Sequence, residues 1–264
     1  MENKKIKALF FDIDGTLVSF LTHRIPQSTV DALEKAKENG VKVYISTGRP
    51  KMIITNLGQI EHLIDGFITT NGARCFVGQH LVCQHPISRE DVDKVVRAAD
   101  RDGYPVIVVG EEHLAIHHLT PIVEEIFVKG LGVDSLDFKT NLADLAGESI
   151  LQLTPFCSEA QERALMPTLD HCTSGRWHPA FTDITDRDAD KGSGLHSMAA
   201  YLGLEISETM AFGDGGNDLS IIREAGIGVA MGNAGDNVKS VADYVTTSVD
   251  DDGIKNALVH YGVI

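Results

Sequence analysis

FFDIDGTL, residues 10–17, is the stretch of this sequence that decides the fold. Its apolar start predicts a short buried strand, and the Asp and Gly residues that follow predict a turn at the carboxyl end of that strand. Ligands of open α/β sheets bind at this edge, so Asp12 and Asp14 are placed where a reactive site is expected. Asp and Gly are also ordinary turn residues, and this simpler interpretation stays open for the octapeptide taken alone.

Strands and helices alternate regularly in the two outer parts of the chain. The periodicity predicts helices at residues 28–40 and 51–60 and strands at 41–45 and 67–70. The same alternation returns near the C-terminus, at 191–202, 209–212, 218–225, 227–230, 236–240 and 243–246. This order is typical of an α/β fold with a parallel sheet covered by helices.

The middle of the chain has a different order of elements. It predicts helices at 88–102, 122–128 and 159–166, strands at 106–109, 114–117 and 150–154, and an extended segment at 176–181. Such an arrangement between two α/β segments indicates an inserted α+β domain. The sequence therefore predicts a discontinuous core, residues 1–81 and 187–264, and a second domain, residues 82–186.

Composition excludes several classes of partner. The formal net charge of −15 at pH 7 repels polyanions, which argues against nucleic acid and acidic membrane surfaces. Cys75, Cys83, Cys157 and Cys172 lack CxxC spacing, so reduced thiols are expected rather than a zinc site or a disulfide framework. The basic N-terminus leads into a short strand instead of a signal-peptide core. We therefore expect a cytoplasmic protein.

A second acidic loop follows a later strand. GDGGND, residues 213–218, presents Asp214, Asp218 and an amide where glycines permit a tight turn, although a solvated acidic turn is the simpler alternative. Together with Asp12 and Asp14, these carboxylates would crowd negative charge at one edge of the sheet. A hard cation bound by the carboxylate oxygens relieves the repulsion between these charges. Because all the expected ligands are oxygen atoms, the sequence predicts Mg²⁺.

Two predicted helix starts add groups that bind anions. Lys191 opens one helix, where the helix dipole already favours an anion, although most lysines are simply exposed. Thr47 and the amide of Gly48 precede another helix and resemble a cradle for phosphate oxygens; an N-cap is the ordinary alternative for this threonine. Cations and amide donors would thus lie near the acidic residues.

Four motifs occur in a familiar order: DIDGTL at 12–17, STGR at 46–49, KG at 191–192 and GDGGND at 213–218. They resemble the four motifs of the haloacid dehalogenase superfamily. Asn71-Gly72-Ala73 and the domain inserted after the third strand resemble its Cof-like type IIB branch, and within it the bacterial hexose-phosphate phosphatases. The resemblance implies a Rossmann-like three-layer αβα core with a parallel sheet and an inserted α+β cap of the C2B type that controls substrate specificity.

The same resemblance implies a role for each motif residue. Asp12 would attack phosphorus and become an aspartyl-phosphate, and Asp14 would protonate the leaving oxygen and then deprotonate water. Mg²⁺ would be held by Asp12, the Asp14 carbonyl and Asp214, with Asp218 as a further or outer support. The residues that match positions binding phosphate oxygens are Thr47, Gly48, Lys191 and Asn217.

Substrate contacts are expected from both predicted domains. Candidates are Arg49 and Asn71 in the core and Arg176 and Trp177, with His178 beside them, in the cap. Trp177 could stack on a sugar face, although a single tryptophan more often packs in a core. These residues would distinguish one phosphate ester from another.

The adjacent pair His117 and His118 lies in a predicted strand. Successive side chains of a strand point to opposite faces, so the two imidazoles are not expected to share a metal ion. Surface or core positions are the ordinary expectation for most of the 11 histidines. The sequence therefore predicts no metal site at this pair.

Three other functions stay open on the sequence alone. A phosphosugar mutase of the same cap type would return phosphate to the sugar. A phospho-accepting signalling module would be one compact domain without need of Asp14 or a cap, and a binding module that uses Mg²⁺ would release no phosphate. We expect a Mg²⁺-dependent phosphatase of small phosphomonoesters, monomeric or a weak homo-oligomer, with neither nucleic acid nor membrane as a partner.

Overall fold

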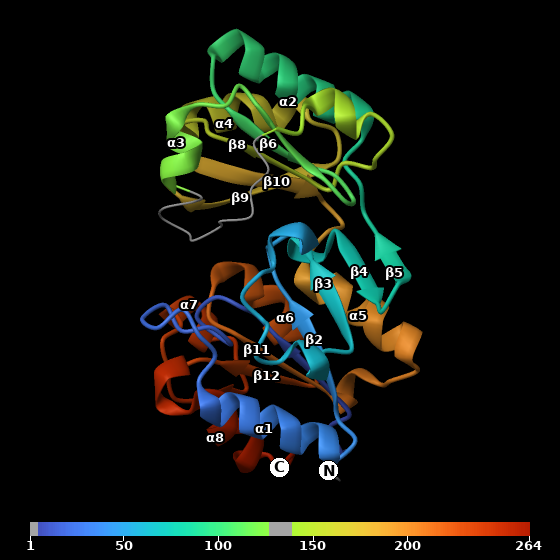
Figure 1. Cartoon of the computed structure of the whole chain (residues 1–264), viewed down its shortest axis with the longest axis vertical. Coiled ribbons are helices and arrows are strands. Elements are labelled where there is room, and N and C mark those ends of the chain that lie inside the picture. The colour runs from blue at the N-terminus through green and yellow to red at the C-terminus, as the bar shows by residue number, and fades with distance from the viewer. Residues whose placement is uncertain (1–4, 127–138) are drawn as a thin grey trace. The chain divides into compact units, whose positions relative to one another are not determined.

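The computed structural model describes residues 5–126 and 139–264, coloured along the chain in Figure 1. They form two compact units. The first comprises Met1–Gly48, Asn56–Gln84 and Asp190–Ile264, and the second comprises Arg49–Thr55 and His85–Ala189. Within the described part of the chain, no helix has the length and apolar character required to cross a membrane.

The first unit is built on an eight-stranded sheet in the order β13-β12-β11-β1-β2-β3-β4-β5. Its strands are β1 Ala8–Phe11, β2 Lys42–Ser46, β3 Gly66–Thr69, β4 Arg74–Val77, β5 His80–Gln84, β11 Thr209–Gly213, β12 Ile227–Ala230 and β13 Tyr244–Val245. Its helices are α1 Gln27–Glu38, α5 Lys191–Leu202, α6 Leu219–Glu224, α7 Asp236–Lys239 and α8 Gly253–His260. Strands β13 to β3 run parallel, and the hairpin β4–β5 extends the sheet antiparallel.

Helices cover both faces of this sheet, which explains why β1 is apolar at every position. Phe10 stacks on Tyr44 with ring centroids 5.0 Å apart and belongs to a core cluster that includes Leu195 of α5. Phe11, its neighbour, stacks on Phe212 at 4.7 Å. Helix α1 packs against β2 and against α8 and supplies another helical layer. The predicted α/β core with a largely parallel sheet is confirmed.

Two details before residue 85 differ from prediction. The helix predicted at 51–60 is wrong: one 3₁₀ turn spans Lys51–Ile53, and Ile54 returns to extended backbone. Thr55, Asn56 and Gly58 are poor helix formers and do not continue the turn. The β4–β5 hairpin, whose connection contains Gly78 at φ +57°, is also not predicted from the sequence.

The second unit is a five-stranded antiparallel sheet in the order β7-β6-β8-β10-β9. Its elements are α2 Arg89–Asp102, β6 Val106–Val109, β7 Leu114–His117, α3 Pro121–Val123, β8 Gln152–Pro155, α4 Glu159–Leu165, β9 Cys172–His178 and β10 Phe181–Asp186. Residues of α2, β6 and β8 share one core cluster, so this helix covers one face of the sheet. The α+β character predicted for the middle of the chain is confirmed.

The boundaries of this unit differ from the predicted 82–186. Residues Arg49–Thr55 group with it because Ile53 is buried in a cluster with Ile107, Val109 and Phe156 of the second unit. In place of the helix predicted at 122–128, the structure shows the short helix α3. Residues 127 and 128 of the predicted helix lie outside the described residues.

His117 and His118 also contradict the sequence-based expectation. His118 follows β7 with φ +56°, a left-handed conformation that turns its side chain away from the strand alternation. Both imidazoles consequently hydrogen-bond the same carboxylate, that of Asp100 on α2. The expectation that the pair points to opposite faces is wrong.

Candidate active site

The carboxyl ends of β1 and β11 bring the predicted acidic residues to one edge of the first sheet. In the parallel register, Phe11 lies beside Phe212 on one side and Ile45 on the other. Asp12 follows β1 directly, and its N–H donates to the Phe212 carbonyl at 3.1 Å. Asp214 follows β11 in the same way. Two segments about 200 residues apart in sequence thus present their carboxylates together.

Asp12, Asp214 and Asp218 form a compact acidic cluster, with one carboxylate oxygen of each within 4.8 Å of the others. Asp218 Oδ2 accepts hydrogen bonds from the backbone N–H groups of Asp214 at 3.0 Å and Gly215 at 2.9 Å, which fixes the acidic loop. Thr16 Oγ1 donates to Asp214 Oδ1 at 2.9 Å. The DIDGTL and GDGGND motifs are therefore joined by side-chain contacts as well as by strand pairing.

Lys191 is the cation of this cluster and is almost completely buried. Its Nζ lies 2.6 Å from Asp12 Oδ1 and 2.6 Å from Asp218 Oδ1. Burial alone would lower the pKa of Lys191, but Asp12 and Asp218 raise it above its ordinary value. The ammonium therefore stays charged and holds two carboxylates in place through short, charge-assisted hydrogen bonds.

The start of α5 explains how Lys191 reaches this position. Asp190 caps the helix, and its Oδ1 accepts from the N–H groups of Gly192 at 2.8 Å and Ser193 at 3.1 Å. Although burial opposes it, a hydrogen bond from the Ser193 hydroxyl, together with these backbone hydrogen bonds, holds the pKa of Asp190 below its ordinary value. Gly72 lies against this cap, since a Cβ there would come within 2.1 Å of the Asp190 carbonyl oxygen. The NGA motif thus supports the lysine.

Gly72→Ala is therefore expected to destabilise the protein by more than the backbone strain of an alanine at positive φ. Gly72 has φ +97°, and Gly40 has φ +82° with no atom within 4 Å of the place that a Cβ would occupy. Gly40→Ala should cost about 1–2 kcal/mol, the ordinary penalty of a left-handed alanine. Gly72→Ala adds a backbone clash, and we expect at least about 3 kcal/mol in urea unfolding. Equal losses in the two variants would contradict the packing of Gly72 on the α5 cap.

The cluster carries more negative charge than Lys191 neutralises. Burial raises the pKa of Asp12 well above its ordinary value, and Asp218 and Asp14 add to this while Lys191 opposes it. Burial also raises the pKa of Asp214 to about 6, with Asp218 and Asp14 contributing and the Thr16 hydrogen bond opposing. Asp14 therefore lies close enough to act on both carboxylates. Crowded carboxylate oxygens of this kind fit a hard divalent cation such as Mg²⁺.

Three of the predicted phosphate-binding residues, Thr47, Gly48 and Asn217, lie together where β2, β3 and β11 end, and Asn71 lies beside them. Asn217 Nδ2 donates to Asn71 Oδ1 at 3.1 Å, and a Cβ on Gly48 would lie 3.0 Å from that oxygen and 3.4 Å from Asn217 Nδ2. Thr47 is buried, and its carbonyl accepts from the Asn71 N–H at 3.0 Å. Backbone and amide donors from three motifs therefore converge here.

Asn233 belongs to the candidate site but not to the set of residues predicted from the sequence. Its Nδ2 donates to the Gly15 carbonyl at 2.8 Å and lies 3.4 Å from Asp214 Oδ2, and its Oδ1 accepts from the Val249 N–H at 3.0 Å. Asn233 comes shortly after β12, so the rule that polar residues at strand ends form the site could have found it. It joins the loops after β1 and β11.

Two of the predicted substrate-contacting residues, Arg176 and Arg49, make hydrogen bonds within the second unit. The Arg176 guanidinium donates to Glu162 Oε2 at 2.7 Å and to the carbonyls of Cys157 at 3.0 Å and Pro179 at 3.1 Å. These contacts hold the Arg176 guanidinium in place within the unit. Arg49 also groups with the second unit, where it donates to the Ile53 carbonyl at 3.4 Å. The Trp177 side chain lies outside the described residues.

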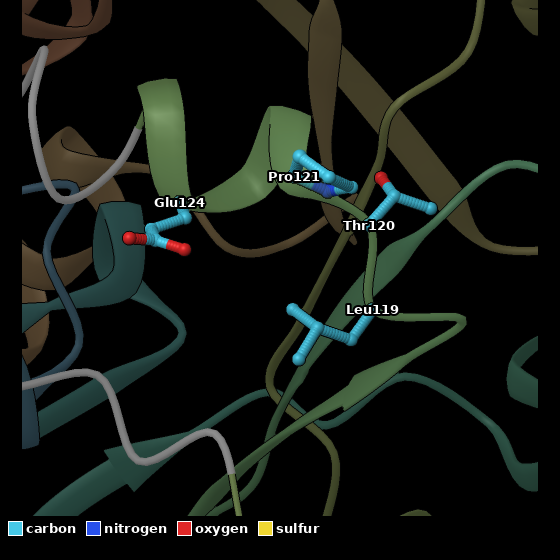
Figure 2. A pocket seen from close by; sticks show the side chains of 4 residues that line it. All are labelled: Leu119, Thr120, Pro121 and Glu124. Atoms are coloured by element: carbon cyan, nitrogen blue, oxygen red, sulfur yellow. The ribbon is translucent and has the colours of Figure 1, made fainter.

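A hollow of the second unit, drawn in Figure 2, has a volume of about 310 Å³. Leu119, Thr120, Pro121 and Glu124 line it, and Leu119 is half exposed. Its lining combines one carboxylate and one hydroxyl with apolar groups, and it includes no residue assigned to the site from the sequence. The residues predicted to react with substrate therefore lie away from this hollow.

Comparisons with known proteins identify the family of this chain. Residues 9–258 match the family model of the haloacid dehalogenase-like hydrolases. YkrA of Bacillus subtilis strain 168, which carries the provisional name of phosphatase, is 32% identical over 262 residues, covering 98% of each chain. BT4131, a sugar phosphatase of haloacid dehalogenase subclass IIB, has a similar structure, with a TM-score of 0.89 and 45% identity over 98% of this chain and 100% of that one.

A second solved structure gives the same result. BT1666 of Bacteroides thetaiotaomicron, one of the phosphatases of this superfamily, has a TM-score of 0.87 and 38% identity, covering 98% of this chain and 96% of that one. The match extends over almost the whole chain, and the four motifs lie at the strand ends and helix start that the resemblance requires. The chain therefore belongs to the haloacid dehalogenase-like hydrolases, in their Cof-like type IIB branch of phosphatases.

Proposed function

We propose that this phosphatase is Mg²⁺-dependent, acts on small phosphomonoesters with hexose phosphates as the preferred class, and forms an aspartyl-phosphate on Asp12. The observation that carries this proposal is the buried Lys191 clamped between Asp12 and Asp218, with Asp214 alongside. The similarity to a sugar phosphatase of subclass IIB supports the substrate class.

Asp12 is the nucleophile of this proposal. One of its oxygens forms a bond to phosphorus while the bond from phosphorus to the leaving sugar oxygen breaks. Lys191 favours the ionised form of Asp12 and restricts its rotation, because the ammonium lies 2.6 Å from Oδ1. Two of the three ammonium donors are used by Asp12 and Asp218, and the third is left for a phosphate oxygen.

The acidic cluster would hold the cation through Asp12, Asp214, the Asp14 carbonyl and, directly or in an outer position, Asp218. When bound, Mg²⁺ would neutralise the charge that otherwise repels the phosphoryl group from the carboxylates. Thr47, the Gly48 amide and Asn217 would bind the remaining phosphate oxygens. Most of the rate enhancement would then come from positioning and charge stabilisation.

Asp14 is the general acid and base of the proposal. It lies two residues after the nucleophile, near enough to raise the pKa of Asp12 and of Asp214. As an acid it gives a proton to the leaving sugar oxygen, and as a base it later takes one from the water that attacks phosphorus. The second step releases inorganic phosphate and restores the Asp12 carboxylate.

Asp14→Asn is expected to slow the hydrolysis of a hexose phosphate by about 10²–10⁴-fold, the usual contribution of general acid–base catalysis. The loss with p-nitrophenyl phosphate should be smaller in the pre-steady-state burst, because that leaving group hardly needs a proton. Burst rates for both substrates measured in parallel check this. The same loss on both would contradict the acid role of Asp14.

The second unit is proposed to act as a cap that selects the substrate. The test is a phosphatase screen with Mg²⁺ over hexose, pentose, nucleotide and cofactor phosphates, ranked by kcat/KM. We expect release of inorganic phosphate with hexose phosphates at the top of the ranking. Transfer of phosphate back to a sugar without release, or an inactive protein, would contradict the proposed hydrolysis.

Location and assembly complete the proposal. The structure places none of the four cysteines in a disulfide, and Cys75, Cys157 and Cys172 are buried. This thiol state supports a reducing compartment, and we propose the cytoplasm. We further propose a monomer or weak homo-oligomer, which sedimentation analysis at several concentrations would test.

A further inference from the structure

Three metal-ligating side chains of the second unit converge on one point that the phosphatase chemistry does not use. The Nε2 atoms of His117 and His118 lie 2.7 Å and 2.8 Å from the same atom, Asp100 Oδ1. The two imidazole rings are 4.1 Å apart at their centroids. One ligand atom from each of the three residues lies within 4.8 Å of the others.

The backbone brings these groups together. His117 ends β7 on the same side as Ala115, which packs in the core cluster beneath α2. His118 would point the other way in a continued strand, but its φ of +56° returns its ring to that side. Asp100 lies in the last turn of α2, one turn after Val96, which packs against the same cluster. The C-terminal end of α2 and the end of β7 thus meet at this group.

The donor set favours a different ion from that of the acidic cluster. Two imidazole nitrogens and one carboxylate oxygen suit Zn²⁺, which in its catalytic sites takes three protein ligands and keeps a fourth position for water. Tetrahedral zinc places its ligand atoms roughly 3.4 Å apart, slightly wider than the distances here. Asp100 and His118 are about half exposed, so their side chains have room for this small adjustment.

We propose that Asp100, His117 and His118 form a second metal site, selective for Zn²⁺ or a similar borderline cation, which fastens the end of α2 to the end of β7. The site belongs wholly to the second unit and is independent of the proposed phosphatase function. Bound zinc would stabilise this unit, because the unfolded chain does not hold the three ligands together.

The test is calorimetric titration of the whole protein with ZnCl₂, comparing wild type with His118→Asn and Asp100→Asn. Asparagine tolerates positive φ, so His118→Asn removes the imidazole while keeping the backbone turn. All three proteins keep Asp12, Asp214 and Asp218. Any zinc that binds to this acidic cluster therefore contributes equally to the three titrations. We expect both variants to lose one high-affinity zinc-binding site, or to bind zinc there with an affinity at least about tenfold lower.

Two controls make the result specific. His113→Asn removes an exposed histidine of the same unit that pairs with the single carboxylate of Glu148, and it should leave zinc binding unchanged. Nitrogen NMR of the imidazoles should show zinc-dependent chemical-shift changes for His117 and His118. Zinc should also raise the midpoint temperature of unfolding of the wild type, but not that of His118→Asn. The rival group of ligands in this part of the chain is His85 with Asp186 and Asp188. Unchanged affinity in both variants, or zinc binding that is lost in His85→Asn instead, would overturn the proposal.

Discussion

Asp12→Asn should lower kcat by about 10⁴-fold or more, the size of loss found when a catalytic nucleophile is removed. The substitution keeps the shape of the side chain but takes away the anion that attacks phosphorus. Folding should survive, because Lys191 keeps its 2.6 Å contact with Asp218. Steady-state phosphate release from the best substrate of the screen measures the effect, and circular dichroism checks the fold.

A matched control separates loss of the nucleophile from loss of charge. Asp31→Asn changes an exposed aspartate on α1 whose partner is Gln27, and it should retain wild-type kcat. Activity of Asp12→Asn within tenfold of wild type would contradict the assignment of Asp12. Full activity in the control, with almost none in Asp12→Asn, is the result that the proposal requires.

Lys191→Met should have the largest effect on stability. The methionine leaves Asp12 and Asp218 buried without their cation, and removal of one partner from a buried ion pair typically costs about 3–5 kcal/mol. The phosphate oxygen that Lys191 is proposed to bind also loses its donor, so kcat/KM should fall in the same variant. Urea unfolding followed by circular dichroism, in the absence of divalent cations, measures the stability change.

Two further variants test the cause. Lys37→Met breaks a partly exposed ion pair with Asp65 and should cost no more than about 1 kcal/mol. Adding Asp218→Asn to Lys191→Met removes one of the unpaired charges, so the double variant should regain part of the lost stability. If the double variant is as unstable as the sum of the single variants, charge pairing is not what Lys191 provides.

The meeting of the acidic residues was predictable because they lie in short local motifs at strand ends. Asp12 and Asp214 each follow an apolar strand, and parallel pairing brings such strand ends to one edge whatever their distance in sequence. Lys191 was predictable as the first residue of a helix with clear periodicity. The sequence does not reveal that its ammonium lies between Asp12 and Asp218, because that depends on how α5 packs on the sheet.

The missed features depend on contacts between distant segments. Asn233 gains its role only from the loops that it joins, and its local sequence is that of an ordinary turn. Arg176 looked available in sequence, but Glu162 and two backbone carbonyls occupy its guanidinium. His118 follows residues typical of a strand. No glycine or proline next to it indicates the turn that its positive φ makes.

The helix predicted at 51–60 failed for a related reason. Its apolar spacing was helical, but Ile53 is buried in the second unit instead of on the face of a longer helix. Tertiary packing thus overrode local periodicity, as it does for weakly helical sequences. The β4–β5 hairpin is not predicted because its two strands, on either side of Gly78, are short. They also come just before the inserted domain, where the order of elements changes.

The most direct test of the proposed chemistry is to identify the residue that carries phosphate during turnover. The wild-type protein is mixed with Mg²⁺ and its best hexose phosphate, quenched in acid within one turnover, digested and examined by mass spectrometry. We predict an acid-stable, base-labile phosphoryl group on the peptide that contains Asp12, absent from Asp12→Asn. Substrate hydrolysed at the normal rate with no phosphorylated peptide, or with phosphate on another residue, would contradict the assignment of Asp12 as the nucleophile.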